Sequence, residues 1–257
     1  MTKALRAHRL SNMGFRRWRI ANSSEAAPAT TVLRGCWPFS RANARWVRPH
    51  LVLWAFDADN RSWGHMNEPH DLDAWRKGER TRLIDARMAV PASGREERTL
   101  RIAAQLEELI GDPAGLVVSA YWPFRGEPDL KPLLKRLRER GATTALPVVV
   151  RKAEPLVFRA WRSGARLERG VWNIPFPADG PEILPDIAIA PVVGFDRACY
   201  RLGYGGGFFD RTMAALPRKP RFFGVGYAEQ EIATIFPQPH DIAMQAVITE
   251  SEIVRPA

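Results

Sequence analysis

Cysteine is rare in this sequence, and its two copies, Cys36 and Cys199, lie far apart with no CxxC pair. This spacing argues against a disulfide framework or a zinc site and favours the reducing conditions of the cytoplasm. Long apolar runs are also lacking, since no stretch approaches the roughly 18 uncharged apolar residues of a membrane-spanning helix. We therefore expect a cytoplasmic protein without a membrane partner, whose 257 residues suffice for a substantial core.

Acidic residues are scarce near the N-terminus. Residues 1–65 hold 11 Lys and Arg against 3 Asp and Glu, a net charge of +8, whereas the rest of the chain carries only +2. A protein that binds a nucleic-acid backbone should carry its positive charge on the folded domain. Because the folded part is close to neutral, we expect no nucleic-acid partner, and a basic nucleic-acid-associated protein is the least favoured alternative.

The first 65 residues show no helical or alternating pattern longer than a few residues, and ANSSEAAPATT at 21–31 is typical of a loop. Three interpretations compete: a basic binding tail, an Arg-rich transit-like segment, or a stretch that is not translated because synthesis starts at Met66. We prefer the third, because the first helix cap follows Met66 at once. We accordingly divide the chain into a disordered or untranslated extension, residues 1–65, and one domain, residues 66–257.

Helical and strand patterns alternate from residue 71 onward. Asp71 and Asp73 are candidate caps of a helix that ends near residue 90, and Ser93 with Glu96 has capping-box spacing for a second helix, which Gly111 ends. Further helices are expected at 129–141 and 208–216, and strands at 115–122, 144–150, 154–161, 185–193, 221–227 and 246–249. This order predicts an α/β fold, a three-layer α/β/α arrangement with a largely parallel, Rossmann-like sheet.

The segment CYRLGYGGGFFDR at 199–211 lies between an apolar strand and an expected helix. Glycines let backbone N–H groups converge on an anion, a helix N-terminus favours negative charge, and ligands of α/β sheets bind at the carboxyl ends of strands. Arg201 and Arg211 can bind phosphate, and Asp210 can hold Mg²⁺. The segment is neither a P-loop nor GxGxxG, because Phe208 and Phe209 follow the glycines. A phosphate-binding loop is favoured over a plain turn in which Asp210 caps the helix.

The same segment closely resembles the signature F-D-x-x-G-x-R-L-G-x-G-x-G-Y-Y-D of the 5-formyltetrahydrofolate cyclo-ligases, also called methenyltetrahydrofolate synthetases. The resemblance covers about residues 73–250. It implies that the loop binds ATP through Arg201, Gly203, Tyr204, Gly205, Gly206, Gly207, Phe208, Phe209 and Asp210.

Other segments match the family in order. WRKGERTRLIDAR at 75–87 resembles its first helix, in which a basic pair, here Arg76 and Arg80, contacts ATP phosphates; otherwise this pair is a solvated basic face. YWPFRGEPD at 121–129 resembles the segment whose glutamate, here Glu127, binds the folate pterin; otherwise Glu127 is a carboxylate at a helix N-terminus. PHDIAM at 239–244 carries Asp241, which matches the second metal-site aspartate.

The resemblance also implies a reaction. ATP phosphorylates the formyl oxygen of 5-formyltetrahydrofolate, N10 attacks, and phosphate leaves to give 5,10-methenyltetrahydrofolate and ADP. Arg201 and Asp210 are the implied catalytic groups, and Asp210 with Asp241 would hold Mg²⁺. The implied folate contacts are Glu127, Tyr121, Trp122 and Trp172, with Phe124 and Phe158 as further stacking candidates. We expect small-molecule substrates as the partners, and a monomer.

Two departures from the signature bear on activity. Cys199 stands where the family has glycine, and a positive φ there would strain a cysteine. Phe208 and Phe209 replace two tyrosines, so a hydroxyl that would help to position the formyl or phosphate group is missing. The main alternative is therefore a non-catalytic paralogue that binds folate or nucleotide.

Overall fold

The computed structural model describes residues 54–57, 62–65 and 68–256. Residues 51–257 form one compact unit. Its helices are α1 (Leu72–Ala89), α2 (Ala92–Ile110), α3 (Lys131–Glu139) and α4 (Phe208–Ala215), with short 3₁₀ turns η1 (Val171–Asn173) and η2 (Ala228–Gln230).

A seven-stranded sheet forms the centre, in the order β13-β12-β11-β8-β3-β4-β5. The five inner strands run parallel, and an antiparallel strand closes each edge. The strands are β3 (Val117–Ser119), β4 (Thr143–Val148), β5 (Val157–Ala160), β8 (Ile187–Pro191), β11 (Arg221–Val225), β12 (Ala246–Ile248) and β13 (Ile253–Val254).

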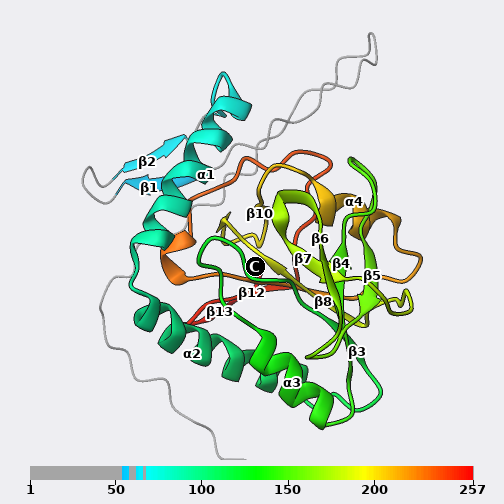
Figure 1. The fold of residues 1–257 in the computed structure, drawn as a ribbon. Coiled ribbons are helices and arrows are strands. Elements are labelled where there is room, and N and C mark those ends of the chain that lie inside the picture. Colours follow the sequence, from blue (N-terminus) through cyan, green and yellow to red (C-terminus); the bar gives the residue numbers. More distant parts are fainter. Residues whose placement is uncertain (1–53, 58–61, 66–67, 257) are drawn as a thin grey trace, which may run out of the picture. The chain divides into compact units, whose positions relative to one another are not determined.

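Alternate side chains of the middle strand β8 enter two different cores. Ile187 and Ile189 pack against the buried faces of α2 and α3, whereas Ala188 and Ala190 face the side that carries Met213 of α4. Figure 1 shows α2 and α3 lying together along one face of the sheet. A strand buried on both faces is therefore apolar throughout, and the three-layer α/β/α prediction is confirmed.

A third, smaller core fixes α1 near the carboxyl end of β8. Leu83 of α1 is buried with Val193, Leu202 and Ile235. A Cβ atom on Gly194 would lie 2.6 Å from the Leu83 Cδ1 atom, so only glycine allows this approach. Here β9 (Gly194–Phe195) pairs with β10 (Arg201–Leu202), which leads into the glycine-rich loop.

Several local predictions can be compared with the structure. The Asp71 carboxylate accepts a hydrogen bond from the Ala74 N–H, so the predicted cap of α1 is confirmed. The capping box at Ser93 is wrong, because α2 begins directly after Pro91 and has no side-chain cap. Proline presets a φ close to that of a helix, which lets α2 start two residues earlier than predicted.

Two hairpins were not predicted. In one, β6 (Leu167–Arg169) pairs with β7 (Pro175–Pro177), and η1 forms the tip between them. In the other, β1 (Trp54–Asp57) pairs with β2 (Ser62–His65), within the segment for which we expected no regular structure. The predicted extension otherwise lies outside the described residues, and the boundary after residue 65 stays a prediction. None of the helices at residues 68–256 combines the length and apolarity needed to span a membrane.

Candidate active site

A cavity of about 240 Å³ opens at the carboxyl ends of the parallel strands, beside Pro147 of β4 and Pro191 of β8. The phosphate candidate Arg211 and the stacking candidate Phe158 do not line it, whereas the other residues predicted for the site do. They are Arg76, Arg80, Tyr121, Trp122, Phe124, Glu127, Trp172, Arg201, Gly203, Tyr204, Gly205, Gly206, Gly207, Phe208, Phe209, Asp210 and Asp241. The topology thus brings together segments that lie up to 165 residues apart in the chain.

The glycine-rich loop adopts backbone conformations that residues other than glycine could take up only with strain. Gly205 and Gly207 have φ values of 90° and 60°. A Cβ atom on Gly206 would lie 2.8 Å from the Phe208 ring, so a side chain there requires the ring to move. The Arg80 Nε–H donates to the Gly203 carbonyl at 2.8 Å and ties the loop to α1. The three glycines therefore allow the loop to adopt this conformation, and they also leave its backbone N–H groups accessible.

The surroundings of this loop favour an anion. Gly207 is the N-cap of α4 and offers no side-chain acceptor to the first helical N–H groups. Burial, and then the charge of Arg76, lower the pKa of the neighbouring Arg80 guanidinium. An anion placed between this guanidinium and the helix N-terminus would relieve the repulsion and interact with the helix dipole. The loop can accordingly hold phosphate groups.

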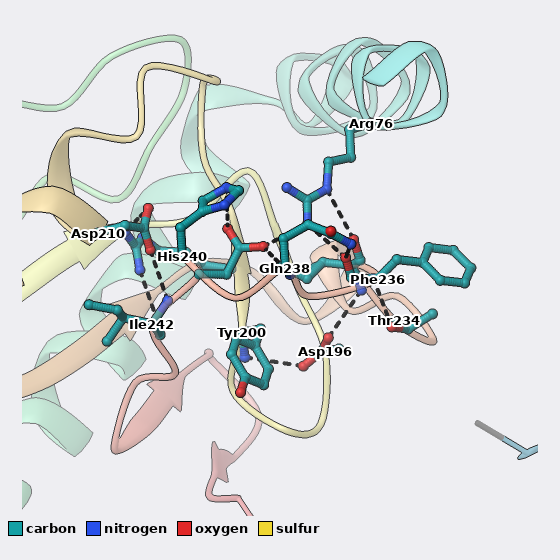
Figure 2. A network of polar contacts seen from close by, with 12 residues as sticks. Arg76, Asp196, Tyr200, Asp210, Thr234, Phe236, Gln238, His240 and Ile242 are labelled. Carbon is teal, nitrogen blue, oxygen red and sulfur yellow. Dashed lines mark hydrogen bonds and ion pairs between the residues drawn. The ribbon is translucent and has the colours of Figure 1, made fainter. Parts of the chain in front are cut away.

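Both predicted metal carboxylates are bound to arginines, as Figure 2 shows for part of this network. The Arg201 Nη2 atom lies 2.9 Å from Asp210 Oδ2, and the Ile242 N–H donates to Asp210 Oδ1. The Arg76 Nη2 atom lies 2.7 Å from Asp241 Oδ2, and Arg76 also donates to two backbone carbonyls. Burial lowers the pKa of Arg201, against the effect of the Asp210 charge.

We tested whether these carboxylates suit Mg²⁺. Residues 68–256 contain no group of three or more His, Cys, Asp or Glu side chains arranged for a metal ion. Asp241 Oδ1, however, makes only a 3.8 Å contact with the exposed His240 imidazole. Because Mg²⁺ is usually held by one or two carboxylates together with substrate phosphates and water, Asp210 and Asp241 fit this mode of binding.

The cavity is also lined by a buried acid. Glu127 accepts hydrogen bonds from the Phe124 N–H and the Tyr204 hydroxyl, both at 2.9 Å. Burial raises its pKa from 4.5 to about 7, although these two hydrogen bonds and the charge of Arg87, 3.9 Å away, act in the opposite direction. Each carboxylate oxygen keeps a lone pair, so Glu127 can accept two further N–H groups from a ligand.

Sequence reasoning missed Arg87, whose side chain is fully buried. It donates to the Tyr204 hydroxyl at 2.7 Å, to the Arg125 carbonyl at 2.9 Å and to the Val192 carbonyl at 3.2 Å. A signal was present, because Arg87 lies eleven residues after Arg76 in one helix, about three full turns, and hence on the same face.

Aromatic side chains form part of the wall. Trp122 packs edge-on against Trp161, and Trp172 at the tip of the β6–β7 hairpin lies 5.9 Å from the Tyr204 ring. Trp172 is 50% exposed and lines the cavity, so its indole can contact a ligand. Phe158 is 2% exposed and packs in the sheet core, which makes its suggested stacking role wrong.

The two departures from the signature have clear consequences. Cys199 is fully buried with a φ of 61°, so the predicted strain is present. The Phe209 ring stacks on Phe222 and lies under the Arg201 guanidinium, 5.6 Å from its carbon. Phenylalanine therefore keeps the packing and the cation–π contact, while a hydroxyl is missing.

With this geometry in view, the chain can be compared with known proteins. The sequence profile described as the 5-formyltetrahydrofolate cyclo-ligase family matches residues 72–250. The chain belongs to this family. The cyclo-ligase profile thus covers α1, the cavity and the central sheet up to β12.

Individual cyclo-ligases agree with this assignment. A 5-formyltetrahydrofolate cyclo-ligase from Mycolicibacterium smegmatis is 33% identical over 178 residues, which covers 66% of this chain and 91% of the relative. One from Escherichia coli K12 is 33% identical over 144 residues, or 53% and 79% of the two chains. A solved 5,10-methenyltetrahydrofolate synthetase from Aquifex aeolicus superposes with a TM-score of 0.61 at 25% identity, covering 70% of this chain and 92% of the other.

A second solved synthetase, from Mycoplasma pneumoniae, is more distant. It has a TM-score of 0.57 at 19% identity and covers 68% of this chain and 98% of its own. This likeness shows that the two proteins share a fold.

Proposed function

We propose that this chain converts 5-formyltetrahydrofolate into 5,10-methenyltetrahydrofolate, with ATP consumed to ADP and phosphate. The observation that carries the proposal is that one cavity is lined both by the glycine-rich, anion-binding loop and by the buried acid Glu127. Membership of the cyclo-ligase family, over residues that include the loop and Glu127, supports the same reaction.

The glycine end suits a triphosphate. The backbone N–H groups of the loop, together with Arg76, Arg80 and Arg201, surround this part of the cavity with donors and positive charge. Phosphoryl transfer depends mainly on positioning and on neutralising charge, and these groups supply both. Mg²⁺, held by Asp210 and Asp241 when bound, would add further charge neutralisation.

The acid end suits a pterin. An ionised Glu127 can accept two neighbouring N–H groups of the ring, while Trp122, Phe124 and Trp172 line the same space and offer faces for stacking. A folate bound in this way directs its formyl group toward the glycine loop. The cavity would then hold the formyl oxygen near the terminal phosphate of ATP.

The chemistry requires no covalent bond to the protein. The formyl oxygen attacks the γ-phosphorus and ADP leaves, which activates the formyl carbon. N10 adds to that carbon, phosphate departs with the former formyl oxygen, and the N10 proton is lost. Arg201 is placed to stabilise the transferred phosphoryl group once it releases Asp210, and exclusion of water protects the activated carbon.

The alternative of a non-catalytic paralogue rests on Phe208 and Phe209, which lack the hydroxyl of the family signature. A spectrophotometric assay separates the two possibilities. Purified protein with 5-formyltetrahydrofolate, ATP and Mg²⁺ should develop the near-ultraviolet absorbance of methenyltetrahydrofolate. Folate binding without an ATP-dependent absorbance change would favour the paralogue.

We further propose that the enzyme acts as a cytoplasmic monomer without a nucleic-acid partner, and that residues 1–65 are not needed for catalysis. The start of the family match at residue 72 supports the last point. A shortened chain that begins at Met66 should keep the full turnover rate, and light scattering should give the mass of one chain. A shortened chain that folds but has lost activity would contradict this division.

A further inference from the structure

We propose that Tyr204 is a positioning residue that couples nucleotide binding to folate binding, an inference that rests on the proposed function. Tyr204 belongs to the glycine-rich loop, yet its hydroxyl lies at the pterin end and donates to Glu127 Oε1 at 2.9 Å. One residue thus joins the two halves of the cavity. Its position is one that the family signature leaves unspecified.

The direction of this hydrogen bond is fixed by Arg87. The Arg87 Nη2 atom lies 2.7 Å from the Tyr204 oxygen, and a guanidinium N–H can only donate. The hydroxyl must therefore accept from Arg87 and give its single hydrogen to Glu127. Arg87 itself is held by the Arg125 and Val192 carbonyls and is fully buried, so it acts as a rigid support for the hydroxyl.

The ring of Tyr204 is also set among aromatic side chains. Its centroid lies 5.7 Å from that of Phe124 and 5.9 Å from that of Trp172, both of which line the cavity. These contacts do not depend on the hydroxyl. A phenylalanine at this position would therefore keep the packing and lose the two hydrogen bonds of the hydroxyl, to Glu127 and from Arg87.

Glycines flank Tyr204 within the loop, so a small number of side-chain contacts determine the position of the loop. Besides Tyr204, the Arg80 guanidinium holds the Gly203 carbonyl and the Arg211 guanidinium holds the Gly206 carbonyl. A nucleotide that binds the loop N–H groups favours the loop position in which the hydroxyl meets Glu127. The same position orients Glu127 for the pterin, so each ligand prepares the site of the other.

Thermodynamic linkage makes this inference quantitative. If one ligand lowers the dissociation constant of the other by a given factor, the second ligand must lower that of the first by the same factor. Retention of part of the Tyr204–Glu127 hydrogen bond in the coupling predicts a factor of about five or more.

The test is calorimetric titration of the full chain with 5-formyltetrahydrofolate, with and without Mg²⁺ and adenylyl imidodiphosphate, which cannot transfer its terminal phosphate. Wild-type protein should bind folate about five-fold tighter or more when the nucleotide analogue is present, and the reverse titration should give the same factor. Tyr204→Phe should bind each ligand alone but show a factor below about two.

Tyr200→Phe is the matched control. Tyr200 lies four residues earlier, and its hydroxyl makes no hydrogen bond with the residues that the structure describes. This variant should keep the wild-type coupling factor. Circular dichroism and thermal unfolding establish that both variants fold.

The outcomes are distinct. Equal coupling in wild type and Tyr204→Phe, or independent binding in wild type, would overturn the role of Tyr204 while leaving the proposed function intact. Failure of wild-type protein to bind 5-formyltetrahydrofolate at all would remove the proposed function, and this inference with it.

Discussion

Glu127 offers the sharpest test of the site, through the substitution Glu127→Gln. Burial raises the pKa of this carboxyl from 4.5 to about 7. Between those two values the folded chain binds a proton that the unfolded chain has already released, so folding stability falls as the pH rises. The difference between the two pKa values corresponds to about 3 kcal/mol. This contribution is fully present below about pH 4.5 and is lost as the pH rises through about 7.

The variant removes that titration. Glutamine has nearly the shape of a protonated glutamic acid, but its NH₂ group faces one of the two donors that Glu127 accepts from, Phe124 N–H or Tyr204 O–H. We expect a loss of stability at pH 5 and a relative gain of about 3 kcal/mol for the variant between pH 5 and pH 8. Urea unfolding of both proteins at the two pH values measures this difference. Titrations that are common to both proteins cancel in the comparison.

Folate binding should change in the opposite sense. Only the ionised carboxylate accepts two pterin N–H groups, so wild-type affinity for 5-formyltetrahydrofolate should rise as the pH passes through about 7. The variant should show little pH dependence of this kind and bind about ten-fold or more weakly at pH 8, since a hydrogen bond to a charge contributes about 1.5–3 kcal/mol. If stability and folate affinity depended on pH in the same way in wild type and in Glu127→Gln, the reasoning would be refuted.

Three further predictions concern the loop and its flanks. Replacing alanine by glycine lowers the folding stability by about 1 kcal/mol at the exposed helix position Ala104 and by about 2 kcal/mol at an unstrained buried site. At position 199, the Cys199→Gly variant should be less stable than Cys199→Ala by under about 1 kcal/mol, because glycine relieves the strain of the positive φ. A difference of about 2 kcal/mol in urea unfolding would exclude strain at this position. Asp210→Asn should abolish turnover in the absorbance assay while circular dichroism shows the fold intact, and wild-type rates would remove Asp210 from the site. Phe209→Tyr should raise kcat by up to about ten-fold by restoring a hydroxyl beside Arg201, and an unchanged kcat would show that the hydroxyl is not needed.

Much of the fold follows from local sequence patterns. The inner strands are continuous apolar runs, and the leucine stripe of α3 is buried as its 3.6-residue period predicts. The cavity could be anticipated for a related reason, because segments that follow parallel strands meet at one edge of the sheet. The β6–β7 hairpin was missed, since its strands are only three residues long and so carry little pattern.

The pairing of side chains within the site was not predictable in the same way. Arg87, Tyr204 and Glu127 lie far apart in the sequence, and their contact depends on how α1 packs against the loop. The arginine partners of Asp210 and Asp241 were equally hidden, because residue type alone does not show which opposite charge is nearest. Such pairings require the tertiary structure.

The arginine–aspartate pairs also determine how charge changes when substrate enters. In the free protein, Arg76 and Arg201 are neutralised by Asp241 and Asp210 at 2.7 and 2.9 Å. A nucleotide that arrives with its counter-cation offers phosphates to the arginines and the cation to the aspartates, so existing ion pairs exchange partners and no isolated charge is left in the cavity. Since few free ions are released or taken up in such an exchange, the affinity for nucleotide should depend only weakly on salt concentration, despite the number of arginines that surround it.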